Sequence, residues 1–144
     1  EIGAITAGAD AETIRICREF GNLLGYSFQI RDDIFDYDKT ADIGKPTGND
    51  IREGKITLPL LYALKTGDEK EVAALKEIIY KKDFTQQNID KLIAFAIENG
   101  GIEYAESQME DYHNKAKELL SQLPPSESRE ALEELADYVV NRKK

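Results

Sequence analysis

The stretch AETIRICREFGNLLGYSFQIRDDIFD, residues 11–36, decides the fold class. Apolar side chains recur in it every three or four residues, which is the period of one face of an α-helix. They are Ile14, Cys17, Phe20, Leu24, Phe28, Ile34 and Phe35. Asp10 is a suitable N-cap residue for such a helix, and Glu12 would lie in its first turn. We therefore predict one long helix over about residues 10–38.

The rest of the chain consists of one loop and further helices. Residues 39–56 carry glycines and a proline among polar residues, with no apolar period, which predicts a loop. Helical patterns resume over residues 57–144, at 58–64, 68–81, 86–98 and 101–123, and again after the N-cap Ser126. Because no alternating strand pattern occurs, the predicted fold class is all-α.

Composition excludes several classes of function. The formal net charge is −9, which opposes general attraction to nucleic acid or to anionic lipid. No stretch reaches the roughly 20 apolar residues of a transmembrane helix. The single Cys17 excludes an internal disulfide and a cysteine-rich zinc site, and is consistent with a cytoplasmic protein. The single His113 lies among charged residues and is expected at the surface rather than in a catalytic site.

Three aspartates at the end of the long helix form the candidate site. Asp32 and Asp36 are one helical turn apart, Asp33 flanks them, and Gln29 falls on the same stripe one turn earlier. Like charges at such spacings destabilise a helix by about 0.2–0.5 kcal/mol per pair. A divalent cation would offset this repulsion. Carboxylates without neighbouring His or Cys favour a hard ion, Mg²⁺ before Zn²⁺.

These carboxylates cannot enclose Mg²⁺ alone, because the ion usually takes one or two carboxylates together with water and phosphate oxygens. The following loop carries Lys45, Arg52 and Lys55, which suit phosphate. The sequence therefore predicts a diphosphate bridged by Mg²⁺. A solvated acidic face is the plain alternative. An EF-hand is excluded, because Ala41 stands where that motif needs glycine and Thr47 where it needs glutamate.

Three ordered segments resemble a known family. They are GYSFQIRDDIFD at residues 25–36, DIGKP at 42–46 and NDIREGKITLP at 49–59. Together they resemble the second aspartate-rich region of trans-isoprenyl (polyprenyl) diphosphate synthases, with a strong match over residues 20–64. The resemblance implies an antiparallel helical bundle of the isoprenoid synthase type around a central cavity, working as a homodimer. It also implies a prenyltransferase that condenses isopentenyl diphosphate head-to-tail with an allylic diphosphate, with Mg²⁺ as cofactor.

The resemblance assigns a role to each residue of the candidate site. Asp32 is the leading metal ligand and catalytic residue, and Asp33 and Asp36 act directly or through bound water. Gln29 and Lys45 resemble residues that contact the allylic diphosphate. Lys55 resembles a residue near the diphosphate of the closed site. Phe28 is expected to line the cavity beside the reacting isoprenoid.

One departure from the family is larger than any substitution. Family members carry a first aspartate-rich motif followed by an arginine pair, and an upstream Lys-Thr contact, and none of these occurs in residues 1–144. We expect the chain to be the carboxy-terminal half of a synthase domain and to be inactive alone. The alternatives are a non-catalytic partner subunit of a prenyl synthase and a terpene cyclase. In the family, product length depends on residues near the first motif.

Overall fold

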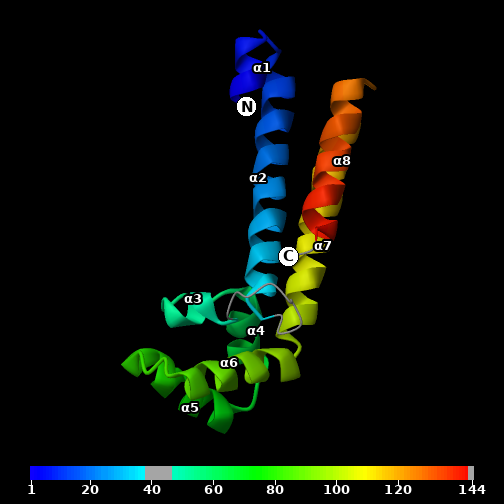
Figure 1. Cartoon of the computed structure of the whole chain (residues 1–144). Coiled ribbons are helices and arrows are strands. Elements are labelled where there is room, and N and C mark those ends of the chain that lie inside the picture. Colours follow the sequence, from blue (N-terminus) through cyan, green and yellow to red (C-terminus); the bar gives the residue numbers. More distant parts are fainter. Residues whose placement is uncertain (38–46, 143–144) are drawn as a thin grey trace. The chain divides into compact units, whose positions relative to one another are not determined.

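The computed structural model describes residues 1–37 and 47–142. Within these ranges the chain forms eight helices and no strand, which confirms the all-α prediction (Figure 1). The helices are α1 (Ile2–Thr6), α2 (Ala11–Phe35), α3 (Asn49–Arg52), α4 (Leu58–Thr66), α5 (Glu69–Lys81), α6 (Gln86–Glu98), α7 (Gly101–Ser121) and α8 (Glu127–Asn141). None of the helices in these ranges is both long enough and apolar enough to cross a membrane.

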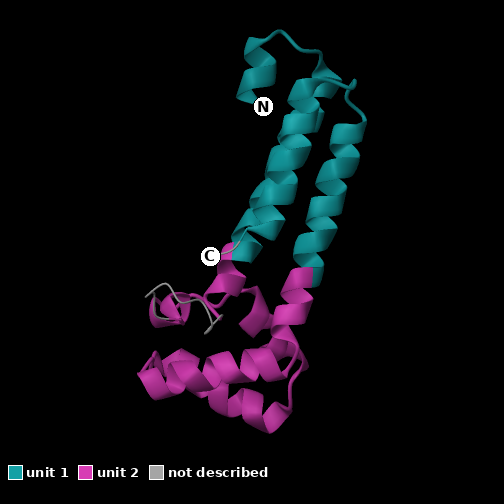
Figure 2. Cartoon of the chain, turned by 45° about the vertical axis from the view of Figure 1, so that its right-hand side comes forward, with its two compact units in different colours: residues 1–31, 107–143 teal, residues 32–106, 144 magenta. Residues whose placement is uncertain are grey.

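The chain divides into two compact units (Figure 2). Unit 1 comprises residues 1–31 and 107–143, and unit 2 comprises residues 32–106 with residue 144. Helices α2 and α7 contribute residues to both units. The candidate site residues fall on both sides of this division, because Phe28 and Gln29 belong to unit 1 and the three aspartates belong to unit 2.

Unit 1 contains most of α2, most of α7 and all of α8, which lie side by side (Figure 1). Its core joins Phe20 of α2 to Ala116 and Leu120 of α7 and to Ala136 of α8, all at most 6% exposed. The buried hydroxyl of Ser27 donates to the Met109 carbonyl at 3.3 Å. Phe20, two turns earlier on α2, shares its core cluster with Ala116 and Leu120, which come later on α7, so the two helices run antiparallel.

The buried positions of α2 include Ile16, Phe20, Ser27, Ile30 and Ile34. Of the other residues in the predicted stripe, Ile14, Cys17, Leu24 and Phe35 are partly buried and Phe28 is exposed, so the buried face agrees with the prediction only at Phe20 and Ile34.

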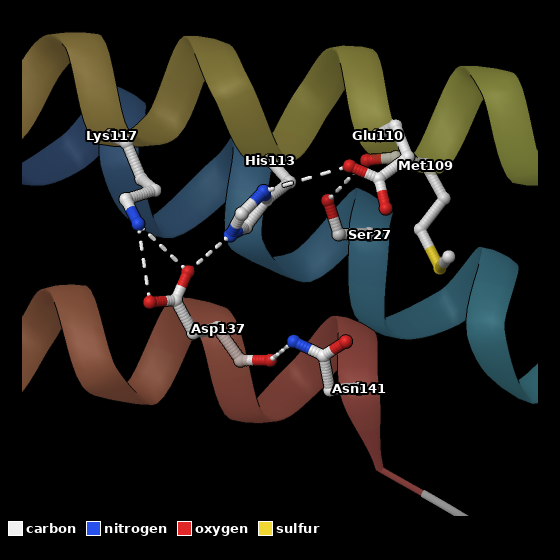
Figure 3. A network of polar contacts seen from close by, with 7 residues as sticks. All are labelled: Ser27, Met109, Glu110, His113, Lys117, Asp137 and Asn141. Atoms are coloured by element: carbon white, nitrogen blue, oxygen red, sulfur yellow. Dashed lines mark hydrogen bonds and ion pairs between the residues drawn. The ribbon is translucent and has the colours of Figure 1, made fainter.

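His113 is not the surface residue that its charged neighbours suggested. Its side chain is only 12% exposed, and Nε2 lies 2.8 Å from Oδ1 of Asp137 on α8 (Figure 3). Lys117, one turn further along α7, donates to both oxygens of the same carboxylate at 2.9 and 3.1 Å. The surface expectation was wrong because α8 packs over this face of α7, which the local sequence of α7 does not reveal.

Unit 2 is built around α4, α5 and α6. Its core consists of side chains that are at most 8% exposed, chiefly Tyr37, Ile51, Leu60, Val72, Leu75, Ile89, Leu92, Ile93 and Phe95. Gly101 allows α7 to begin directly against α4, since a Cβ atom at this position would overlap the Pro59 carbonyl oxygen. The rings of Tyr62 and Tyr104 stack beside this junction with centroids 4.1 Å apart.

Most predicted helix ends agree with the structure to within a few residues. Asp68, Thr85 and Ser126 each accept hydrogen bonds from main-chain N–H groups as N-caps. Two details differ. The long helix ends at Phe35, followed by a turn in which the N–H groups of Asp36 and Tyr37 bond to carbonyls three residues earlier. The predicted loop over residues 39–56 contains the one-turn helix α3.

Candidate functional site

Two of the three aspartates occupy the last turn of α2, and the third follows it. Asp33 and Asp36 are 9% and 8% exposed, and Asp32 is half-buried. The last turn of α2 contains no basic residue. The carboxyl end of a helix carries a partial negative charge, which disfavours each nearby carboxylate by about 0.3–1 kcal/mol. The local field at this end of α2 therefore favours a cation.

Asp36 links the end of α2 to the start of α3. Its Oδ1 accepts a hydrogen bond from the Asn49 N–H at 2.9 Å, and its Oδ2 accepts one from the Asp50 N–H at 3.0 Å. Its main-chain carbonyl accepts a third bond, from the Gly48 N–H at 2.9 Å. The aspartate therefore satisfies the buried main-chain donors of a segment thirteen residues away.

Gly48 allows the chain to enter α3 so close to the core. Its φ of 77° lies in the left-handed region that favours glycine. A Cβ atom at this position would overlap Cγ2 of the fully buried Ile89 and lie 3.1 Å from Cδ1 of Ile93. A side chain at position 48 is therefore disfavoured by both conformation and space.

Lys55 follows α3 and presents its ammonium group at the surface of unit 2. Its main-chain N–H donates to the Asp50 carbonyl at 2.8 Å. Its Nζ lies 2.7 Å from Oε2 of Glu53 and 3.3 Å from Oδ1 of Asp50. Hydrogen bonds to Glu53 and then to Asp50 raise the pKa of Lys55 above its usual 10.5, so the side chain is cationic at neutral pH.

Tyr37 directly follows the acidic motif (Asp32, Asp33 and Asp36) and gives its end a second contact within unit 2. Its hydroxyl lies 3.0 Å from Oγ1 of Thr57, the residue that precedes α4. The side chain is only 3% exposed, and burial raises the pKa of Tyr37 to about 12. Tyr37 is therefore neutral at physiological pH and acts here as a packed anchor.

Phe28 and Gln29 lie one turn before the aspartates along α2. Phe28 is 43% exposed, and the Arg142 guanidinium lies over its ring at 4.0 Å from the centroid. Gln29 is exposed. Both residues therefore have the accessibility that substrate contact needs. The predicted contact Lys45 lies outside the described residues, as do Asp42, Gly44 and Pro46.

The carboxylate oxygens of the site suit a hard cation that takes some of its ligands from the protein and the others from a substrate. Among residues 1–37 and 47–142, no three His, Cys, Asp or Glu side chains are placed so that they alone could hold a metal ion. Asp32 and Asp33 are adjacent oxygen donors, and oxygen donors of this kind suit Mg²⁺ or Ca²⁺. The residues present therefore fit an ion whose remaining ligands come from water and phosphate.

Comparison with known proteins shows the family of this chain and agrees with its fold. A family model described as "Polyprenyl synthetase" matches residues 1–96. The geranylfarnesyl diphosphate synthase of Aeropyrum pernix is 36% identical over 146 residues, covering 99% of this chain and 45% of that protein. The chain belongs to the polyprenyl synthetase family. It spans less than half the length of the curated relatives it matches.

Two solved structures have the same helical fold. The crystal structure of a geranylgeranyl pyrophosphate synthase from Bacteroides thetaiotaomicron is 44% identical, with a TM-score of 0.88, and the match covers 96% of this chain and 46% of that one. A polyprenyl synthase from Caulobacter crescentus, crystallised with calcium and isoprenyl diphosphate, is 37% identical with a TM-score of 0.86. That match covers 99% of this chain and 44% of that one.

Proposed function

We propose that this chain supplies the second metal–diphosphate half-site of a trans-isoprenyl diphosphate synthase. The complete synthase, meaning the polypeptide or complex in which the chain is active, would condense isopentenyl diphosphate with an allylic diphosphate. One observation carries the proposal. Asp32 and Asp33 are consecutive residues in the last turn of a helix whose last turn contains no basic residue, and the partial negative charge of that helix end favours a bound cation.

The charged groups have a defined task in this reaction. The allylic carbon–oxygen bond breaks and its electron pair leaves with diphosphate. The double bond of isopentenyl diphosphate then attacks the allylic cation, and a proton is lost from the new intermediate. Mg²⁺, when bound, would stabilise the charge that develops on the departing diphosphate. Asp32 would hold the ion, with Asp33 and Asp36 acting directly or through water.

The cationic and apolar residues would bind the substrate itself. Lys55, and Lys45 in the same loop of the sequence, would neutralise diphosphate oxygens as point charges. Gln29 would donate to the allylic diphosphate, and Phe28 would line the cavity beside the isoprenoid. The Caulobacter crescentus relative, which was crystallised with calcium and isoprenyl diphosphate, supports this choice of ion type and ligand. A homodimer and a cytoplasmic location complete the proposal.

Asp32→Ala in the complete synthase provides the test. Loss of an electrostatic group that acts in the transition state should lower kcat by about 10²-fold or more. Asp111→Ala is the matched control, because Asp111 is an exposed carboxylate on α7 that pairs with Lys115. Unchanged activity in Asp32→Ala would refute the site. The product should be a longer linear diphosphate, and a cyclic hydrocarbon would indicate a terpene cyclase instead.

The chain by itself should show no turnover. Residues 1–144 contain one aspartate-rich motif, whereas the proposed chemistry needs metal ligands on two facing helices. Incubation of this chain with Mg²⁺, isopentenyl diphosphate and an allylic diphosphate should therefore give no product above background. Efficient product formation by the isolated chain would contradict the half-site assignment.

A further inference from the structure

We propose that Asp36 is a positioning residue, which holds α3 and through it places Lys55. This inference rests on the proposed function and narrows the role of Asp36, because its carboxylate would serve the site without being a required ligand of the metal. Asp32 keeps the role of leading ligand. The proposal concerns residues of unit 2 alone, all of them described in the structure.

The carboxylate of Asp36 is bound by main-chain N–H groups. Each of its carboxylate oxygens already accepts a hydrogen bond, from Asn49 N–H at 2.9 Å and from Asp50 N–H at 3.0 Å. The side chain is 8% exposed. Charge-assisted hydrogen bonds on both carboxylate oxygens fix the carboxylate and the start of α3 relative to each other.

Among residues 1–37 and 47–142, Asp36 is the side chain that accepts from the first N–H groups of α3. The helix has four residues, and its N-cap Gly48 has no side chain that could accept from the first free N–H groups. A capping side chain at position 48 is disfavoured by the positive φ and by the overlap with Ile89. Burial of Ile51, which is 1% exposed, fixes α3 against the core but leaves those donors unsatisfied.

Asp50 of α3 connects this helix to the ammonium group of Lys55. The N–H of Asp50 donates to Oδ2 of Asp36, and the carbonyl of Asp50 accepts a hydrogen bond from the N–H of Lys55 at 2.8 Å. Its carboxylate also lies 3.3 Å from Nζ of Lys55. Asp50 therefore contacts Lys55 at its main chain and at its ammonium group, which also pairs with Glu53 at 2.7 Å. A chain of contacts therefore runs from Asp36 through Asp50 to Lys55, which is a residue proposed to bind diphosphate.

Amide hydrogen exchange tests, without any substrate, whether Asp36 holds α3. In the metal-free complete synthase, Asp36→Ala should speed amide exchange in the segment 47–57 about tenfold or more, since one lost charged hydrogen bond already corresponds to that factor. Asp36→Asn retains one acceptor oxygen and should give a smaller increase in exchange. It is the variant to measure if Asp36→Ala does not fold. Asp32→Asn should leave exchange in this segment unchanged. Unchanged exchange in both Asp36 variants would overturn the proposal.

Kinetics separate positioning from metal binding. Asp36→Ala and Lys55→Ala should each raise KM for the allylic diphosphate, and the double variant should be no worse than the worse single variant. The Mg²⁺ concentration for half-maximal rate should stay within about twofold in Asp36→Ala and rise about tenfold in Asp32→Asn. Effects that multiply, or an equal rise in the Mg²⁺ requirement for both aspartates, would overturn the proposal.

Asp68 offers a matched control for the loss of a helix cap. Its carboxylate accepts from the N–H groups of Lys70 and Glu71 at the start of α5, at 2.9 and 3.3 Å, in the same unit. Asp68→Ala should speed exchange at the start of α5 and leave KM for the allylic diphosphate unchanged. If Asp32→Asn changes neither activity nor Mg²⁺ requirement, the proposed function fails, and exchange in the segment 47–57 still decides the role of Asp36.

Discussion

The Arg31 guanidinium donates two hydrogen bonds to the main-chain carbonyl of Arg142, with Nε at 3.2 Å and Nη2 at 2.9 Å from the oxygen. Arg142 follows α8, and Arg31 lies near the end of α2, so the bonds join two residues 111 positions apart. The Arg142 side chain completes the contact by donating from Nη2 to the Phe28 carbonyl at 3.2 Å. The end of α8 is thus attached to the helix that carries the acidic motif.

Arg31→Ala should lower the free energy of unfolding by about 1.5–3 kcal/mol, the range for hydrogen bonds that involve a charged partner. Urea denaturation of residues 1–144 measures the change. Arg18→Ala is the control, because Arg18 is more than half exposed and its pair with Glu1 should contribute at most about 1 kcal/mol. Equal effects of the two substitutions would show that the Arg142 contact adds no stability.

Asp137 should make the stability of unit 1 depend on acid pH. Hydrogen bonds from Lys117 and then His113 hold the pKa of Asp137 below its usual 3.8 (Figure 3). A carboxylate with a lowered folded pKa adds stability that is present above pH 3.8 and is lost as pH falls through the folded value. Asp137→Asn should therefore be less stable than the parent near neutral pH, with the difference shrinking below pH 3.8. Urea denaturation across this range tests it, and a difference that stayed constant down to the lowest pH would contradict the linkage.

Two glycine-to-alanine substitutions should have opposite effects. At Gly101 the new Cβ atom would overlap the Pro59 carbonyl oxygen and lie 2.7 Å from that of Ala96, so main chain must shift at a cost of about 1–3 kcal/mol or more. Gly25 lies within α2, and a Cβ there would meet nothing within 4 Å. Gly25→Ala should stabilise this chain by about 0.5–1 kcal/mol through helix propensity. Thermal unfolding of both variants is the measurement, and destabilisation by Gly25→Ala would contradict the expectation.

Leu92 and Leu61 provide a matched pair for the core of unit 2. Leu92 on α6 is fully buried, and Leu92→Ala should cost about 2–5 kcal/mol because it removes apolar contacts and leaves a cavity. Leu61 on α4 is 56% exposed, and Leu61→Ala should change stability by less than about 1 kcal/mol. Chemical denaturation compares them, and similar losses would mean that α4 buries Leu61 in the state present in solution.

Local patterns predicted most of the helices because the signals that start and stop them are local. Thr85 caps α6 through a hydrogen bond to the N–H of Asn88, three residues away, and the predicted helix over residues 86–98 is the one observed. The same approach missed α3, because its cap is Asp36, thirteen residues earlier. A side chain that acts across such a distance leaves no periodic trace in the sequence.

The sequence alone determined the all-α class, the long helix that carries Asp32 and Asp33, and the resemblance to polyprenyl diphosphate synthases, because periodicity and ordered motifs are properties of neighbouring residues. Only the tertiary structure decided what the third aspartate touches, which carbonyl Arg31 binds, and that α8 covers His113. Those outcomes depend on which distant segments pack together to bury apolar surface and to satisfy main-chain donors.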